Sequence, residues 1–160
     1  FYRLQGVGED GNLYRGELST FTTPAAQEVD AGSNLAVGAT VIDVSSEFSD
    51  SFAGANAIDG SPSTEWSTSG DGDDGFITID LGSPESVVAV RFVTREMSDG
   101  SSIATTYTVT VDDGEVLGPF DAGLDPPTID VEFTGQVIRF DIVSSTGGNT
   151  GAVEIEILGG

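Results

Sequence analysis

Apolar residues recur along most of the chain in short stretches that are separated by glycine, aspartate, serine and proline. Residues 105–111 place Tyr107, Val109 and Val111 alternately with threonines, which is the period of a strand with one buried face. Residues 87–94 are largely apolar, as expected of a central strand. The segments that we expect to be strands are 39–44, 76–81, 87–94, 105–111, 129–133, 136–143 and 152–158. Short strands at regular spacing predict an antiparallel all-β sandwich or jelly roll.

Three turns are expected to divide these strands. Gly82-Ser83-Pro84 should end the strand 76–81, because proline has no N–H to give to a sheet. Asp112-Asp113-Gly114 and Thr134-Gly135 are each expected to form the turn of a hairpin.

The first residues are expected to form a separate β-hairpin around the turn Glu9-Asp10-Gly11-Asn12. An isolated hairpin is marginal in water, so it must pack on the next domain or belong to a domain cut off upstream. Residues 2–7 and 18–23, on either side of this turn, resemble the last two strands of a fibronectin type III domain. The expected organisation is a hairpin at 1–23, a linker at 24–33 and a main domain at 34–160.

Charge narrows the range of partners. The chain has 27 acidic residues, five arginines, no lysine and a formal net charge of −22. Such a protein repels phosphates and anionic lipids, so nucleic acid is excluded as a partner and direct membrane insertion is not expected. Acidic, lysine-free surfaces are typical of salt-adapted proteins, because high salt screens the self-repulsion. A halophilic or marine source is favoured over an ordinary acidic secreted protein.

The residue types also argue against catalysis. Histidine, cysteine and lysine are all absent, which removes the usual bases, nucleophiles and Schiff-base formers. Asp73 and Asp74 could in principle form a glycosidase pair, but they lie in a glycine-rich loop that is better suited to solvent or an ion. The chain starts at Phe1 with no visible signal peptide and has no apolar run long enough to span a membrane. We therefore expect a processed product or fragment that is not an enzyme.

The stretch 56–66 combines apolar residues, a turn and the only tryptophan. Asp59-Gly60 is a turn dipeptide, and a tight turn of this kind points several carbonyls at one spot. Asp59 adds a carboxylate and Thr64 a hydroxyl, so the turn offers an all-oxygen cage of the kind that Ca²⁺ prefers. The alternative is an Asx turn that precedes a core tryptophan. Thr64 and Trp66 would face the same side of an extended segment.

Three ordered motifs carry a resemblance over residues 34–158. The stretch Ser45 to Phe52, followed by 55–67, resembles the opening of a discoidin domain, also called a coagulation factor V/VIII type C domain. Its glycan-binding branch is carbohydrate-binding module family 32. Residues 76–82, an aromatic-led strand ending in Asp-Leu-Gly, are similar to the second signature of the family, and 153–155 resemble its closing strand. The resemblance implies an eight-stranded antiparallel jelly-roll sandwich with loops clustered at one end, and it implies that Trp66 belongs to the core.

The resemblance also implies a structural Ca²⁺ ion. Its ligands would be the Asn56 carbonyl, the Asp59 carboxylate, the Ser61 carbonyl, the Thr64 hydroxyl and carbonyl, the Val153 carbonyl and the Glu154 carboxylate. Such an ion would tie the first loop to the last strand. The alternative for Glu154 is a solvated strand carboxylate, with Glu156 on the same face.

By analogy, a sugar would bind at the loops 45–52, 69–75, 95–103 and 144–151. The candidate ligand-binding residues are Phe48, Phe52, Arg95, Glu96, Asp99 and Asn149. An exposed aromatic stacks on a sugar face, and the polar groups bind hydroxyls. Alternatively, Phe52 fills the core beneath its loop, Arg95 pairs with Glu96 or Asp99, and Asn149 only turns a glycine loop. These loops contain no tryptophan or tyrosine, unlike those of most family 32 glycan binders.

Two functions remain open at this point. The first is an extracellular or cell-surface carbohydrate-binding or adhesion module whose partner is a glycan or cell-surface polysaccharide. The second is a structural β-domain of an extracellular assembly with no sugar site, in contact with neighbouring β-domains or subunits. Both include a structural calcium ion.

Overall fold

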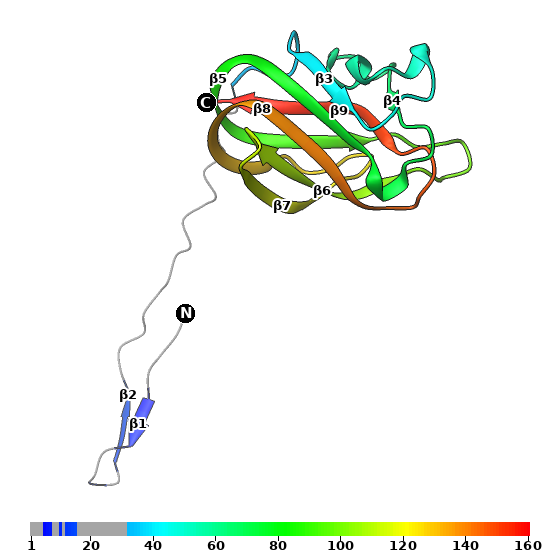
Figure 1. Cartoon of the computed structure of the whole chain (residues 1–160). Coiled ribbons are helices and arrows are strands. Elements are labelled where there is room, and N and C mark those ends of the chain that lie inside the picture. The colour runs from blue at the N-terminus through cyan, green and yellow to red at the C-terminus, as the bar shows by residue number, and fades with distance from the viewer. Residues whose placement is uncertain (1–4, 8–9, 11, 16–31) are drawn as a thin grey trace.

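The computed structural model describes residues 5–7, 10, 12–15 and 32–160. Residues 32–160 fold as an antiparallel β sandwich (Figure 1), which confirms the predicted fold class. The expected linker at 24–33 and the 18–23 strand of the fibronectin-like hairpin lie almost wholly outside the described residues. The domain boundaries therefore stay predictions.

Seven strands form the main sheet system in the described part of the chain, in the order β4-β9-β5-β8-β6-β7 with β3 beside β5. Their bounds are β3 Thr40–Val44, β4 Trp66–Ser67, β5 Phe76–Thr94, β6 Ala104–Val111, β7 Glu115–Asp121, β8 Ile129–Ser145 and β9 Gly151–Gly159. Within residues 32–160 the loops also contain three short 3-10 helices, η1 Asp50–Phe52, η2 Gly54–Ile58 and η3 Gly72–Asp74.

The expected break in β5 at Gly82-Ser83-Pro84 is wrong. The strand continues from Phe76 to Thr94, and only its pairing register shifts between Asp80 and Glu85. The first half of β5 pairs with β3 and the second half with β9, so one strand contributes to both layers. Breaker residues here bend the strand without ending it, because the chain passes directly from one layer to the other.

Strand β8 likewise contributes to both layers. It runs through Thr134-Gly135, so the hairpin turn expected there is wrong and the segments 129–133 and 136–143 form one strand. Residues 129–135 pair with the second half of β5. Residues 137–141 pair with its first half, and residues 138–145 also pair with β6. The described sheet system therefore has seven strands where eight were expected. The turn at Asp112 and Asp113 is as predicted, since both residues have the positive φ angles of a tight hairpin turn, +47° and +56°.

The core lies between the two layers. Trp66, Phe92, Tyr107 and Phe140 are all fully buried. The Tyr107 ring centre lies 5.3 Å from that of Phe92 and 5.8 Å from that of Phe140. Trp66 is core, as predicted, and its indole N–H donates to the Ser46 carbonyl at 3.0 Å. Removing an aromatic side chain of this kind typically costs about 3–5 kcal/mol of stability.

The N-terminal hairpin is described by itself. Strands β1 (Gln5–Val7) and β2 (Leu13–Arg15) pair antiparallel, with Gln5 opposite Arg15. Within the turn, the Asp10 carboxylate accepts hydrogen bonds from the Asn12 main chain and side chain at 3.0 and 2.8 Å. The predicted hairpin is therefore confirmed in these residues.

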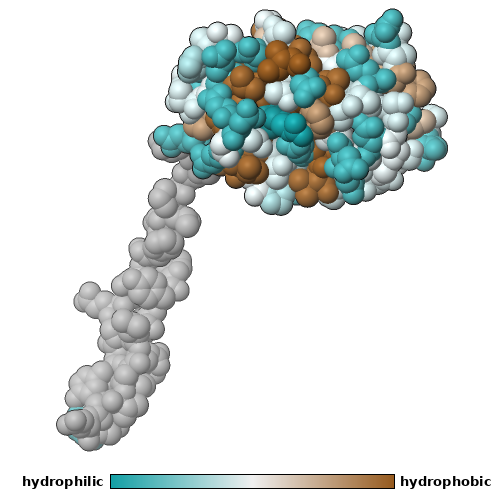
Figure 2. Space-filling view, in the orientation of Figure 1, coloured by the Kyte–Doolittle hydropathy of each residue, from teal (hydrophilic) through white to brown (hydrophobic). Residues whose placement is uncertain are grey.

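The surface is mixed in character. On the face drawn in Figure 2, apolar residues form several separate patches among hydrophilic ones. No helix in the described part of the chain is long and apolar enough to cross a membrane.

Candidate functional site

The turn that follows η2 brings three of the predicted metal ligands together. The Asp59 carboxylate accepts hydrogen bonds from the Ser61 N–H and from the Thr64 hydroxyl, each at 2.8 Å. The Thr64 hydroxyl also lies 3.1 Å from the Ser61 carbonyl oxygen. The Asx turn considered as the alternative is therefore present, and it gathers a carboxylate, a hydroxyl and a carbonyl at one place.

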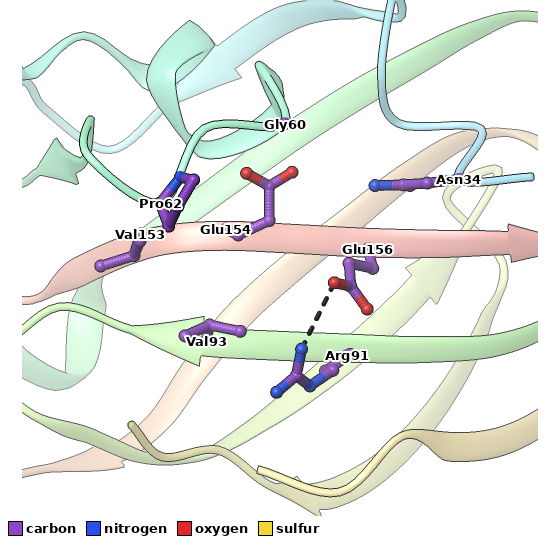
Figure 3. A pocket seen from close by; sticks show the side chains of 8 residues that line it. All are labelled: Asn34, Gly60, Pro62, Arg91, Val93, Val153, Glu154 and Glu156. Carbon is purple, nitrogen blue, oxygen red and sulfur yellow. Dashed lines mark hydrogen bonds and ion pairs between the residues drawn. The ribbon is translucent and has the colours of Figure 1, made fainter. Parts of the chain in front are cut away.

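Glu154 on β9 reaches this turn from the far end of the chain. Figure 3 shows its carboxylate directed towards the loop that carries Gly60. Both carboxylate oxygens are buried, and they accept no hydrogen bond of ordinary geometry from any residue that the structure describes. Glu154 is therefore not the solvated carboxylate of the alternative interpretation.

The electrostatics at Glu154 disfavour its charge. Burial, together with the negative charges of Asp59 and Glu156, raises the pKa of this carboxyl from an ordinary 4.5 to about 7. The Gly60 N–H lies close enough to oppose this shift without overcoming it. Two segments that are distant in sequence thus hold two acidic groups close enough to repel each other.

The arginine on the neighbouring strand is engaged with other partners. Arg91 on β5 donates to Glu156 at 3.3 Å and to Asp125 at 3.1 Å, and its Nε donates to the Pro126 carbonyl at 3.0 Å. In Figure 3 the Arg91 side chain meets Glu156, while Glu154 points away from both. These groups border an open hollow of about 380 Å³. Its lining residues are Asn34, Gly60, Pro62, Arg91, Val93, Val153, Glu154 and Glu156.

The donor set fits a hard cation. A buried carboxylate without a donor is costly, and a cation bound to it removes that cost. Two carboxylates with carbonyl and hydroxyl oxygens form a ligand set typical of Ca²⁺. The described residues contain no cluster of three or more acidic, histidine or cysteine side chains. A cation here would consequently rely on main-chain oxygens, as the predicted set does.

The four loops predicted to carry a sugar site are hydrogen-bonded to one another. The Ser46 hydroxyl donates to Asp71 at 2.6 Å, and the Gly72 N–H donates to the Gly148 carbonyl at 3.0 Å. The Ile103 N–H donates to the Thr146 hydroxyl at 3.0 Å. The loops 45–52, 69–75, 95–103 and 144–151 therefore form one end of the sandwich, as expected.

Two phenylalanines stand at this end. Phe48 is 55% exposed, and it is the only exposed aromatic among the residues whose burial the structure describes. Phe52 is half-buried and meets Phe48 edge to face, with ring centres 5.9 Å apart. Phe52 thus lies beneath its loop, in part as the alternative proposed, and it fixes the orientation of Phe48.

Arg95 is buried behind these rings. Its guanidinium carbon lies 5.9 Å from the Phe52 ring centre, and its Nη1 donates to the Asn149 carbonyl. Its Nη2 pairs with Glu65 at 2.9 Å. Its ion-pair partner in the described chain is therefore Glu65 and neither Glu96 nor Asp99. The sequence did not point to Glu65 as a partner of Arg95. Its position between Thr64 and Trp66 would place it on the opposite side of an extended segment.

Glu96 and Asp99 are exposed in the next loop. The Asp99 carboxylate accepts hydrogen bonds from the Ser101 hydroxyl at 2.6 Å and N–H at 3.1 Å, and these bonds lower its pKa. Among the six predicted ligand-binding residues, the described contacts join Phe48, Phe52, Arg95 and Asn149 into one group. No hydrogen bond, ion pair or ring contact among the described residues joins the side chains of Glu96 and Asp99 to that group, and both are exposed.

Comparison with known proteins identifies the family. The family model of the F5/8 type C domain matches residues 41–157. The chain belongs to this family. No curated protein sequence matches the chain.

Solved structures with the same fold include carbohydrate-binding modules and a lectin domain. A chitosan-binding module from a chitosanase/glucanase of Paenibacillus sp. IK-5 is 25% identical, with a TM-score of 0.62 over 79% of this chain and 99% of the module. The family 32 module of C. perfringens NanJ, in complex with galactose, is 17% identical, with a TM-score of 0.63 over 77% and 95% of the two chains. The lectin domain of lectinolysin, complexed with Lewis B antigen, is 18% identical, with a TM-score of 0.60 over 80% and 97%.

Proposed function

We propose that this domain is a non-catalytic glycan-binding module of an extracellular or cell-surface protein. The observation that carries the proposal is Phe48, an exposed aromatic held edge-on by Phe52 at the loop end of a fold shared with carbohydrate-binding modules. An exposed aromatic that is fixed in orientation loses little freedom on binding, so it suits the apolar face of a sugar ring.

The polar part of the site would come from the adjoining loops. The Asn149 side chain offers both a donor and an acceptor, and Glu96 and Asp99 offer carboxylate acceptors to sugar hydroxyls. A net charge of −22 repels acidic polysaccharides, so neutral or amine-bearing sugars are the expected ligands. One aromatic and a few exposed polar groups give weak binding, and useful affinity would then require several modules or a repetitive glycan.

The second part of the proposal is a structural calcium ion. Asp59 and Glu154 would supply carboxylates, the Thr64 hydroxyl a further oxygen, and Asn56, Ser61, Thr64 and Val153 their carbonyls. This ion would satisfy the buried Glu154 carboxylate and fasten the 56–64 turn to β9. Extracellular modules bind calcium with dissociation constants of about 10⁻⁴–10⁻³ M, which matches an external calcium supply.

A glycan array in calcium and salt tests the sugar site. The wild type should bind neutral or amino-sugar glycans, and Phe48→Ala should weaken that signal strongly. Val116→Ala is the matched control, since Val116 is 61% exposed on β7, a strand outside the four sugar loops. If no glycan binds and the two variants behave alike, the domain is the structural β-domain of the alternative.

A further inference from the structure

Arg95 occupies the position between the two proposed sites. It follows directly on the end of β5 at Thr94, and its N–H donates to the Gly151 carbonyl at the start of β9 at 3.3 Å. Its side chain is only 8% exposed, although the guanidinium is always charged. A buried arginine is stable only when protein groups pair with it, so its partners identify the segments that it holds together.

The partners of Arg95 come from three separate segments. Phe52 belongs to the 45–52 loop and Asn149 to the 144–151 loop. Glu65 follows the 56–64 turn of the proposed calcium site, here called the metal turn. The Nε atom is buried and has no acceptor in the described part of the chain. One face of the guanidinium and both of its Nη atoms therefore contact protein groups.

The 56–64 turn is connected directly to two of these segments, the 45–52 loop and the stretch at Glu65. Glu65 follows directly after Thr64. The Asn56 side-chain amide donates to the carbonyls of Ser51 and Glu65, each at 3.0 Å. Asn56 thus ties the entry of the turn to the phenylalanine loop, and Glu65 ties its exit to Arg95.

We propose that Arg95 is a positioning residue that couples cation binding at the 56–64 turn to the order of two sugar loops, 45–52 and 144–151. This inference rests on the proposed calcium and glycan sites. A cation that fixes Thr64 also fixes Glu65, which holds the guanidinium against Phe52 and the Asn149 carbonyl. By linkage, sugar bound to the ordered loops strengthens cation binding by the same factor as the cation strengthens sugar binding.

Amide hydrogen exchange with and without calcium chloride tests the coupling without any sugar. Calcium should slow exchange in 45–52 and 144–151 by about 5- to 150-fold beyond its effect on the distant hairpin of β6 and β7. Arg95→Lys keeps the charge but loses the fork, and it should remove most of this extra slowing. If Arg95 were purely structural, Arg95→Lys would speed exchange in the two loops by the same factor with and without calcium.

Arg139→Lys is the matched control. Arg139 also stacks on a phenylalanine, 3.7 Å from the Phe76 ring centre, and also pairs with a carboxylate, Asp141, at 2.7 Å. It lies on β8 and contacts neither proposed site. The extra slowing should survive in Arg139→Lys. Glu65→Gln supplies a second test if Arg95→Lys does not fold, because it breaks the same ion pair at a side chain that is 27% exposed.

Calorimetric titration with calcium chloride separates the failures. Calcium binding without extra slowing of the two loops, or with full slowing in both Arg95→Lys and Glu65→Gln, overturns the coupling and leaves the metal site standing. No calcium binding removes the metal site and the coupling together, and the glycan array remains an independent test of the sugar site.

Discussion

The metal turn and the sugar loops lie close together, but they satisfy their acidic groups in opposite ways. In the loops, Asp71 accepts from Ser46, Asp73 from Ser145 and Asp99 from Ser101. At the metal turn, the Glu154 carboxylate is buried without a donor in the described chain. These loop carboxylates are satisfied by hydroxyl donors within the protein, whereas burial of Glu154 is relieved only by protonation or by a bound cation. A buried carboxylate without a donor therefore points to the proposed cation site, whereas the proposed sugar surface has no comparable unsatisfied charge.

Calcium removal should produce the largest effect and the sharpest contrast between the two regions. With free calcium at about 10 mM, roughly 100 times a dissociation constant of about 10⁻⁴ M, a native-state ligand stabilises by about 3 kcal/mol. Chelation at fixed salt should therefore lower the melting temperature by roughly 10 °C, measured by calorimetry. An unchanged melting temperature would contradict the metal site and leave Glu154 without a partner.

The pH dependence of the calcium-free domain should be the next largest effect. The pKa of Glu154 rises from 4.5 in the unfolded chain to about 7 in the fold, so the folded state favours the protonated form. Its contribution is present below pH 4.5 and is lost as pH rises through 7, which costs about 2 kcal/mol after solvent screening. Calcium should cancel this loss by holding the ionised carboxylate.

Glu154→Gln and Glu156→Gln form a matched pair for that measurement, since each removes one charge from the same face of β9. In chelator, urea unfolding of Glu154→Gln should lose the fall in stability between pH 4.5 and 7. Glu156→Gln should retain it, because the Glu156 carboxylate is already paired with Arg91. Equal behaviour of the two variants would mean that burial of Glu154 does not govern the pH profile.

Phe48→Ala should affect recognition and spare stability. Losing a stacking contact on a sugar costs about 1–2 kcal/mol, or roughly 5- to 30-fold in affinity for a glycan identified on the array. Because Phe48 is 55% exposed, the melting temperature should stay within about 2 °C of the wild type. A large drop in melting temperature with intact glycan binding would make Phe48 part of the fold.

Glu96→Gln and Asp99→Asn should have the smallest effects. Both side chains are exposed and contribute single solvated acceptors, so glycan affinity measured by calorimetry should weaken less than about threefold. A loss as large as that expected for Phe48→Ala would move the centre of the site into the 95–103 loop.

Local patterns predicted the parts of the fold that depend on neighbouring residues. The alternation around Tyr107 predicted β6, and the Asp112-Asp113 pair predicted its turn. The strand break at Gly82 was wrong because breaker residues report a local bend, whereas the continuity of β5 depends on the partners of both layers. The arrangement of the loops at one end came from the family resemblance rather than from the period of the residues.

The contacts of the candidate site depend on distance in space and were harder to predict. Strand alternation placed Glu154 and Glu156 on one face, but it could not indicate that Arg91 would pair with Glu156 and not with Glu154. It also could not indicate that the loop at Gly60 would bury Glu154. The Glu65–Arg95 pair joins two loops with no shared pattern, so it became visible only in the folded chain.

Trp66 gives the domain a built-in optical probe. It is the only tryptophan in the sequence, it follows Glu65 directly, and its indole N–H donates to the Ser46 carbonyl at the start of the first sugar loop. Its fluorescence therefore arises from one fully buried position between the metal turn and that loop. Any water that enters there would shift the emission to longer wavelength, so the unlabelled protein can report the state of both regions in a single spectrum.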